Sequence, residues 1–191
     1  LQQEHVSLSL DSTHNLIQQG GTILHSARCK EFKNREGLMK AAENLKQAEI
    51  DTLIVIGGDG SFRGASKLSE HWDGQIIGIP GTIDNDIAGT DATIGYFTAI
   101  DTAMSSIDKV RDTADAFERI FLVEVMGRNA GFLALNAALS SASDYVVVPE
   151  FFESADVEIQ KMVAQIKAQR ALKGAVSFIA VVAENVWPNG L

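Results

Sequence analysis

Two acidic residues, Asp84 and Asp86, follow the apolar run Ile76–Ile79 at a spacing of two positions. Residues i and i+2 of an extended segment point to the same side, so this spacing predicts that both carboxylates share one face. Paired carboxylates can divide their work, because one can accept a proton while the other orients it or serves a metal. A surface Asx turn is the alternative, and the segment considered alone favours that structure.

A glycine-rich segment, Gly57–Ser61, follows the apolar run Leu53–Ile56 and precedes a predicted helix. Glycines let backbone N–H groups approach a phosphate closely, and a helix N-terminus favours negative charge. Asp59 in this segment is a candidate ligand for a magnesium ion that bridges phosphates. The alternative is a tight turn capped by Asp59, but the full run of residues favours phosphate binding. Its spacing matches neither a P-loop nor the dinucleotide-binding fingerprint.

Arginines stand at three further places where a phosphate could bind. Arg28 lies upstream, Arg119 precedes the run Ile120–Val125, and Arg128 follows that run. The forked guanidinium group matches phosphate oxygens, although solvation at the surface is the commoner role of a single arginine. Glu184 ends the last apolar run and is a candidate acceptor for sugar hydroxyls.

These residues need a scaffold, and the hydrophobic pattern predicts one in which strands and helices alternate. Most of the strand candidates are apolar throughout, as expected for strands covered on both faces. Alternation of strand and helix predicts βαβ units and therefore an α/β fold with a parallel sheet. We also expect a strand over Val6–Leu10 that leads into a capped helix ended by Gly20 and Gly21. The predicted strands are Leu53–Ile56, Ile76–Ile79, Ile120–Val125, Tyr145–Val148 and Val176–Val182, and the predicted helices are Asn34–Ala48, a stripe from Phe97 to Ile107, a buried helix over 129–142 and a stripe from Ile159 to Ile166.

Composition narrows the class of protein. The chain has 191 residues, a formal net charge of −9 and 46% hydrophobic residues, which excludes wholesale disorder. No apolar run approaches the roughly 18 residues of a membrane helix, and no secretory signal opens the chain. Cys29 is the only cysteine, so an intrachain disulfide is excluded. The acidic balance argues against a nucleic-acid partner. We therefore expect a soluble, cytoplasmic protein without a nucleic-acid or membrane partner.

Taken in order, these motifs resemble those of bacterial-type ATP-dependent 6-phosphofructokinases, from about Val6 to Glu184. The Gly-Gly-Asp-Gly motif alone is weak, since NAD kinases and diacylglycerol kinases carry something similar. The segment Pro80–Asp86 together with Met126-Gly127-Arg128 is highly specific. The resemblance implies a three-layer α/β sandwich with a mostly parallel sheet, phosphofructokinase-like.

The resemblance also implies a role for each matching residue. Asp84 would be the general base for the sugar 1-hydroxyl, with Thr82 and Asp86 beside it, and Arg28 would stabilise the transferred γ-phosphoryl group. Asp59 would serve magnesium. The nucleotide would be bound by Arg28, Cys29, Gly58, Asp59, Gly60 and Ser61. Fructose 6-phosphate would be bound by Thr82, Ile83, Asp84, Met126, Gly127, Arg128 and Glu184. Arg119 would reach a substrate that is held mainly by a neighbouring subunit.

The phosphoryl donor is implied by two glycines. Pyrophosphate-using relatives carry Asp where Gly60 stands and Lys where Gly81 stands, so this chain resembles the ATP-dependent enzymes. Phosphoryl transfer from ATP to fructose 6-phosphate is therefore the expected function. The alternatives are the pyrophosphate-dependent enzyme and a non-catalytic regulatory chain that senses sugar phosphates. Retention of Asp84 speaks against the regulatory chain, because a pure binding protein needs no base.

The resemblance finally implies a partial core and a homo-oligomer, either a tetramer or a dimer. Residues 1–191 would comprise most of the nucleotide-binding domain and the start of the sugar-phosphate domain from about residue 126. In the family, an N-terminal strand with a phosphate-covering loop precedes this region and a C-terminal half follows it. We expect both outside the chain.

Overall fold

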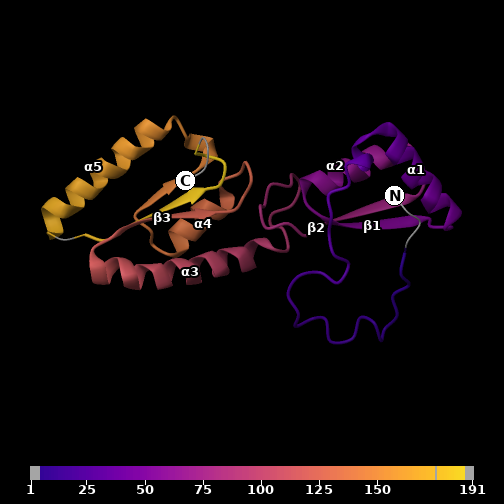
Figure 1. The fold of residues 1–191 in the computed structure, drawn as a ribbon, viewed down its shortest axis with the longest axis horizontal. Coiled ribbons are helices and arrows are strands. Elements are labelled where there is room, and N and C mark those ends of the chain that lie inside the picture. The colour runs from indigo at the N-terminus through magenta and orange to yellow at the C-terminus, as the bar shows by residue number, and fades with distance from the viewer. Residues whose placement is uncertain (1–4, 175, 188–191) are drawn as a thin grey trace. The chain divides into compact units, whose positions relative to one another are not determined.

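The computed structural model describes residues 5–174 and 176–187 (Figure 1). Its contacts divide the chain into two compact units. The first comprises residues 1–55 and 60–79, and the second comprises residues 56–59 and 80–191. The chain crosses between the units near the end of the first strand at residues 55–56, in the segment Gly57–Ser61 at residues 59–60, and next to Pro80 at residues 79–80.

The first unit packs two helices on a two-stranded sheet. Its elements are the 3-10 turn η1 (Glu31–Lys33), α1 (Arg35–Gln47), β1 (Thr52–Gly57), α2 (Asp59–Leu68) and β2 (Gln75–Pro80). The N–H of Gln75 donates to the carbonyl of Asp51, and that of Gly81 donates to Gly57, so β1 and β2 run in the same direction. The core is apolar and consists of Leu38, Ala41, Ala42, Leu68 and Trp72.

The predicted strand and helix before Gly20 are wrong. Residues 5–30 form bends and turns and contain no strand or helix. Val6, Leu10 and Ile17 are each more than four-fifths exposed. A short helix in water is marginal unless tertiary packing buries its apolar face, and a strand needs a neighbour to bond to. Among the described residues, neither form of support reaches this segment.

The second unit is a three-stranded parallel sheet with helices on both faces. Its elements are α3 (Tyr96–Phe117), β3 (Ile120–Val125), α4 (Phe132–Ser140), β4 (Tyr145–Val147), the 3-10 turn η2 (Pro149–Phe151), α5 (Ala155–Lys173) and β5 (Phe178–Ala183). The strand order is β3-β5-β4, with Ile120 beside Phe178 and Tyr145 beside Ala180. This unit thus has the alternating α/β architecture that the sequence predicts.

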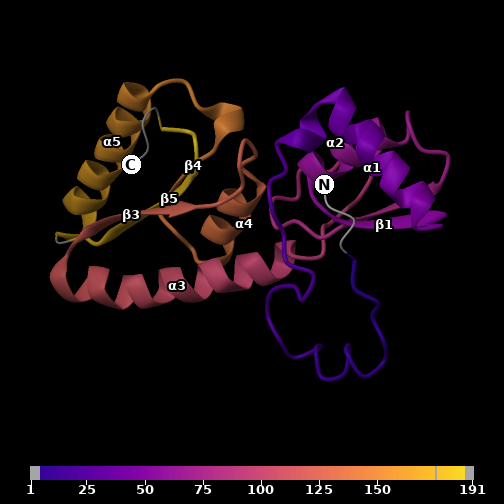
Figure 2. The same ribbon diagram turned by 45° about the vertical axis from the view of Figure 1, so that its right-hand side comes forward.

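Strand β5 forms the centre of this unit, and all six of its residues are buried. Ile179 and Val181 pack with side chains of α3 and α4. Phe178 and Ala180 pack instead with Met162 of α5. Figures 1 and 2 show α5 on one side of the sheet and α3 and α4 on the other. The central strand is therefore covered on both faces, as its continuous apolar run predicts.

Other elements are covered on one face only, which the sequence did not indicate. Ile54 of β1 and Ile120 of β3 are each more than half exposed, in strands whose exposure alternates from residue to residue. In α4 the small residues Ala134 and Ala137 are fully buried, whereas Leu139 is 70% exposed. The prediction of a helix buried all round is thus wrong for α4, because the helix packs through its alanine face.

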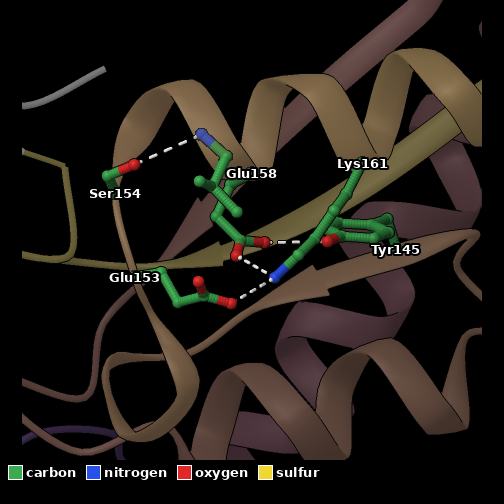
Figure 3. A network of polar contacts seen from close by, with 6 residues as sticks. Tyr145, Glu153, Ser154, Glu158 and Lys161 are labelled. Carbon is green, nitrogen blue, oxygen red and sulfur yellow. Dashed lines mark hydrogen bonds and ion pairs between the residues drawn. The ribbon is translucent and has the colours of Figure 1, made fainter.

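A polar network fixes α5 against β4 (Figure 3). The Tyr145 hydroxyl donates to buried Glu158 over 2.8 Å, and the Lys161 ammonium bonds Glu158 at 2.9 Å and Glu153 at 3.1 Å. Ser154 caps the helix by accepting the N–H of Val157. Burial and the Glu158 carboxylate raise the pKa of Tyr145 to about 12. Burial also raises the pKa of Glu158, but hydrogen bonds from Lys161 and Tyr145 outweigh burial and lower it overall.

No helix among the described residues is long and apolar enough to cross a membrane.

Candidate active site

The glycine-rich segment forms the connection from β1 to α2. Strand β1 ends at Gly57, and Asp59 is the first residue of α2, so Gly60 and Ser61 lie in its first turn. A Cβ atom on Gly58 would lie 3.1 Å from the Cβ of Thr82. Glycine therefore lets this connection approach the segment after β2. Backbone N–H groups at the start of α2 are oriented as an anionic ligand requires.

The acidic pair lies in the loop after β2. Asp84 is buried, with a relative exposure of 7%, and its N–H donates to the Thr82 hydroxyl over 3.2 Å. Asn85 has a φ of +55°, in the left-handed region, so the segment from Asp84 to Asp86 is not extended. The geometric reason for expecting a shared face is thus wrong. The two carboxylates are nevertheless close enough for the charge of Asp86 to act on Asp84.

A second loop, after β3, brings an arginine to this pair. The Nε atom of Arg128 lies 3.7 Å from Oδ2 of Asp84. The backbone of Arg128 is left-handed, with a φ of +56°. A single oxygen of Glu184, Oε1, accepts the N–H groups of Gly127 at 3.1 Å and Arg128 at 2.6 Å. Because Glu184 follows β5, the carboxyl ends of neighbouring strands build this part of the site.

The surroundings of Asp84 raise its pKa above the ordinary carboxyl value. Burial is the largest cause, and the negative charges of Asp86 and Glu184 act in the same direction. The Thr82 side chain and the Arg128 guanidinium lower the pKa but do not cancel the increase. A carboxylate with a raised pKa is a stronger base than one in water, which suits it to accept a proton.

Of the remaining substrate candidates, Ile83 and Met126 lie in or next to these two loops, whereas Arg119 lies far from them. Ile83 is half-buried beside Asp84, and Met126 is 59% exposed at the end of β3. Arg119 precedes β3, so it lies at the opposite end of the strand from Arg128, roughly 20 Å away along six extended residues. Its guanidinium stacks over the Phe117 ring at 4.8 Å. The structure therefore does not bring Arg119 to Asp84.

Arg28 and Cys29 belong to the first compact unit. Both are exposed in the irregular segment before η1. Cys29 is a free thiol. Their assignment to the nucleotide site stays a prediction.

Two asparagines in the site were missed by the sequence reasoning. Asn85 separates the acidic pair, and its Oδ1 accepts the N–H of Thr93 over 2.9 Å. Asn185 has a φ of +62°, and its Nδ2 donates to the carbonyl of Arg128 over 3.1 Å. Asparagine tolerates the left-handed region better than most residues, so its position directly after a catalytic candidate is a signal that could have been used.

The donor groups present fit a magnesium ion that arrives with a nucleotide. Among residues 5–174 and 176–187, no group of three or more His, Cys, Asp or Glu side chains could form a protein-only metal cage. Magnesium in phosphate-transferring proteins commonly takes one or two carboxylates, with phosphate oxygens and water as its other ligands. Asp59, at the start of α2, fits that pattern.

Comparison with known proteins gives consistent matches. The chain is 48% identical over 186 residues to the ATP-dependent 6-phosphofructokinase of Thermoanaerobacter sp. (strain X514), covering 97% of this chain and 56% of that protein. It is 47% identical over 190 residues to ATP-dependent 6-phosphofructokinase 1 of Thermus thermophilus, covering 100% and 58%. The chain thus spans a little over half the length of these curated relatives.

Solved structures match in the same way, and so does a family model. Phosphofructokinase from Saccharomyces cerevisiae superposes with a TM-score of 0.84 at 32% identity, over 95% of this chain and 27% of that one. Pyrophosphate-dependent phosphofructokinase from Marinobacter aquaeolei shares the fold, with a TM-score of 0.74 at 22% identity, over 95% and 47%. The model of the phosphofructokinase family matches residues 1–190. With motifs, site geometry and relatives in agreement, the chain belongs to the phosphofructokinase family.

Proposed function

We propose that this chain carries the phosphoryl-transfer centre of a cytoplasmic ATP-dependent 6-phosphofructokinase, which converts fructose 6-phosphate and ATP into fructose 1,6-bisphosphate and ADP. The observation that carries the proposal is the buried Asp84 carboxylate, which pairs with Arg128 where two strands end, while the Asp84 N–H donates to Thr82. The similarity to the ATP-dependent 6-phosphofructokinases of Thermoanaerobacter and Thermus thermophilus supports the same reaction.

Asp84 acts as the general base. It takes the proton of the sugar 1-hydroxyl as that oxygen attacks the γ-phosphorus and the bond to the ADP oxygen breaks. Thr82 holds the Asp84 backbone by accepting its N–H, and the charge of Asp86 raises the pKa of Asp84 and with it the basicity of the carboxylate. The pairing with Arg128 lowers the pKa of Asp84 and so favours the ionised carboxylate that accepts the proton.

The start of α2 holds the nucleotide phosphates. The N–H groups near Gly58, Gly60 and Ser61 donate to phosphate oxygens, and Asp59 holds magnesium. When bound, magnesium neutralises charge on the transferred phosphoryl group. Arg28 stabilises the γ-phosphoryl group, and Cys29 lies with it on the nucleotide side.

The loop after β3 holds the sugar. Met126, Gly127 and Arg128 contact the fructose moiety together with Ile83. Glu184 is left with a second oxygen for a sugar hydroxyl, because both backbone N–H groups are accepted by Oε1. Arg119, at the far end of β3, reaches the 6-phosphate of a substrate in a neighbouring subunit, so the functional form is a homo-oligomer.

The test is a coupled assay on the complete protein with ATP or pyrophosphate as donor and fructose 6-phosphate as acceptor. We expect ADP release that requires both fructose 6-phosphate and magnesium. Turnover with pyrophosphate alone would move the protein to the pyrophosphate-dependent class, and binding of fructose 6-phosphate without turnover would make it a regulatory chain.

A further inference from the structure

The loop with the acidic pair is held by consecutive backbone N–H groups that lead into α3. The N–H of Ile94 donates to the carbonyl of Pro80 over 2.9 Å, and that of Gly95 donates to Thr82 over 3.2 Å. Both bonds fix the loop before Asp84. The third N–H in the row, that of Thr93, donates to the Asn85 side chain.

Asn85 thus ties the loop down beyond Asp84, where the two backbone bonds do not reach. Its Oδ1 accepts the Thr93 N–H at 2.9 Å, and its Nδ2 approaches the carbonyl of Asp91 at 3.5 Å. Thr93 is 1% exposed, so the N–H that donates to Asn85 belongs to a buried residue and the bond is screened from water.

The backbone of Asn85 adds a second constraint. Its left-handed φ of +55° turns the chain between the two carboxylates. Most side chains are disfavoured in that region, whereas glycine and asparagine enter it readily. Past this turn, Oδ1 of Asp86 is buried without a hydrogen-bond partner in the structure. Among the described residues no hydrogen bond holds that oxygen, so the turn at Asn85 contributes to its placement.

We propose that Asn85 is a positioning residue that sets the placement of Asp84 relative to Asp86 and Arg128, through its left-handed turn and its bond to Thr93. The inference rests on the proposed role of Asp84 as base. It assigns to Asn85 no contact with substrate. Asparagine is the residue that combines tolerance of the turn with an amide able to bond Thr93 and Asp91 at once.

Asn85→Gly in the complete protein removes the hydrogen bond to Thr93 but keeps the turn, because glycine adopts the left-handed backbone and has no side chain. Misplacement of a reacting group by about 1 Å can cost up to about 100-fold in rate. We expect kcat to fall between about 10- and 100-fold, with KM for fructose 6-phosphate changed less than about twofold. Asn15→Gly is the matched control, since Asn15 is also left-handed, with a φ of +59°, and is exposed. It should leave kcat at the parental value.

A double-mutant cycle with Asp84→Asn tests whether the effect acts through the base. In the Asp84→Asn background, Asn85→Gly should cost less than about twofold in the residual kcat. An equal loss in both backgrounds, or parental kcat in the single variant, would overturn the inference. If Asp84→Asn alone keeps parental kcat, Asp84 is not the base and the premise of the inference fails, whereas absence of turnover in the parent would refute the proposed function.

Asn85→Asp provides a variant that folds even where glycine does not, because it keeps the tolerance of the turn and the oxygen that accepts the Thr93 N–H. It should keep kcat within about tenfold of the parent and lose less than Asn85→Gly. A loss of more than about 100-fold in a folded Asn85→Asp protein would also overturn the assignment.

Discussion

The guanidinium of Arg128 lies 3.7 Å from the Asp84 carboxylate, although the two residues come from different strand ends. Arg128 is half exposed while Asp84 is buried, so substrate can reach the arginine from solvent. In the proposed function, this pair joins the arginine that would contact the sugar to the carboxylate that would act as base. Substitution of Arg128 should therefore mainly raise KM for fructose 6-phosphate, and substitution of Asp84 should mainly lower kcat.

Asp84→Asn should lower kcat of the complete protein to a small residual value and leave binding of fructose 6-phosphate largely intact. The amide keeps the shape of the carboxylate but cannot accept the proton, and a general base contributes roughly 10²–10⁴-fold to rate. Steady-state kinetics measures the loss of kcat, and calorimetry measures the binding of fructose 6-phosphate. Asp108→Asn, at an exposed position on α3, is the control and should change neither quantity. Parental kcat in Asp84→Asn would show that another group is the base.

Glu184→Gln should move the acid limb of the kcat profile to lower pH. The negative charge of Glu184 raises the pKa of Asp84, so removing that charge lowers the pKa and keeps Asp84 ionised in more acidic solution. The glutamine carbonyl can still accept the N–H groups of Gly127 and Arg128. The pH dependence of kcat measures the shift. A shift to higher pH would contradict the arrangement.

Glu184→Ala tests the same side chain as a support for the loop after β3. Alanine leaves the N–H groups of Gly127 and Arg128 without their acceptor, at a cost of about 1–3 kcal/mol for each group that stays buried. We expect a rise in KM for fructose 6-phosphate that Glu184→Gln does not reproduce fully. Equal KM values for the two variants would mean that the carboxylate charge alone matters.

Gly60→Asp with Gly81→Lys should depress use of ATP far more than use of pyrophosphate. A Cβ atom at Gly60 meets no atom within 4 Å, so the aspartate fits and would project where a nucleotide phosphate is expected to lie. At Gly81 a Cβ atom would meet the Ile56 Cγ2 at 3.1 Å, a tight contact. The ratio of kcat/KM for the two donors is the readout, with Gly60→Ala as the steric control. Equal losses with both donors would mean that these glycines do not select ATP.

The Tyr145 and Glu158 pair should make stability depend on pH at both ends of the range. The pKa of Glu158 is lowered on folding, so its contribution is present above the ordinary carboxyl value and is lost as pH falls through the folded value. The pKa of Tyr145 is raised to about 12, so its contribution is present below pH 10 and is lost as pH rises toward 12. Urea unfolding of Tyr145→Phe at several pH values checks this. If the free energy of unfolding of Tyr145→Phe changed between pH 9 and pH 11 as much as that of the parent, the loss at high pH would not come from Tyr145.

The strands after residue 50 could be predicted closely because their β-branched runs are bounded by loop residues. Ile120–Val125 was predicted with the bounds that the structure has, and Leu53–Ile56 falls one residue short at each end. Which faces are covered was harder to predict, since five of the six residues of the half-covered β3 are as apolar as those of the fully buried β5, and only Glu124 indicates the exposed face. The segment Val6–Leu10 failed because local propensity does not form a strand without a neighbour.

For the candidate site, too, part could be predicted from the sequence and part could not. The motifs predicted that Asp84, Arg128 and Glu184 belong to one site, because each follows a strand of a parallel sheet. They did not predict the hydrogen bond from the Thr93 N–H to the Asn85 side chain, because that contact joins residues eight positions apart in the sequence. Residue types thus indicated the chemistry, while contacts distant in the sequence determine how the carboxylates are held.

The order β3-β5-β4 has a consequence for how the chain folds during synthesis on the ribosome. Among the three strands of this sheet, β5 is made last, yet it lies between β3 and β4 and bonds to both. A nascent chain that ends before Phe178 lacks the strand that joins its two earlier neighbours and the buried face on which α4 and α5 pack. Ribosome-bound chains stalled at that point should stay sensitive to protease in this unit, and protection should begin only when β5 has left the exit tunnel.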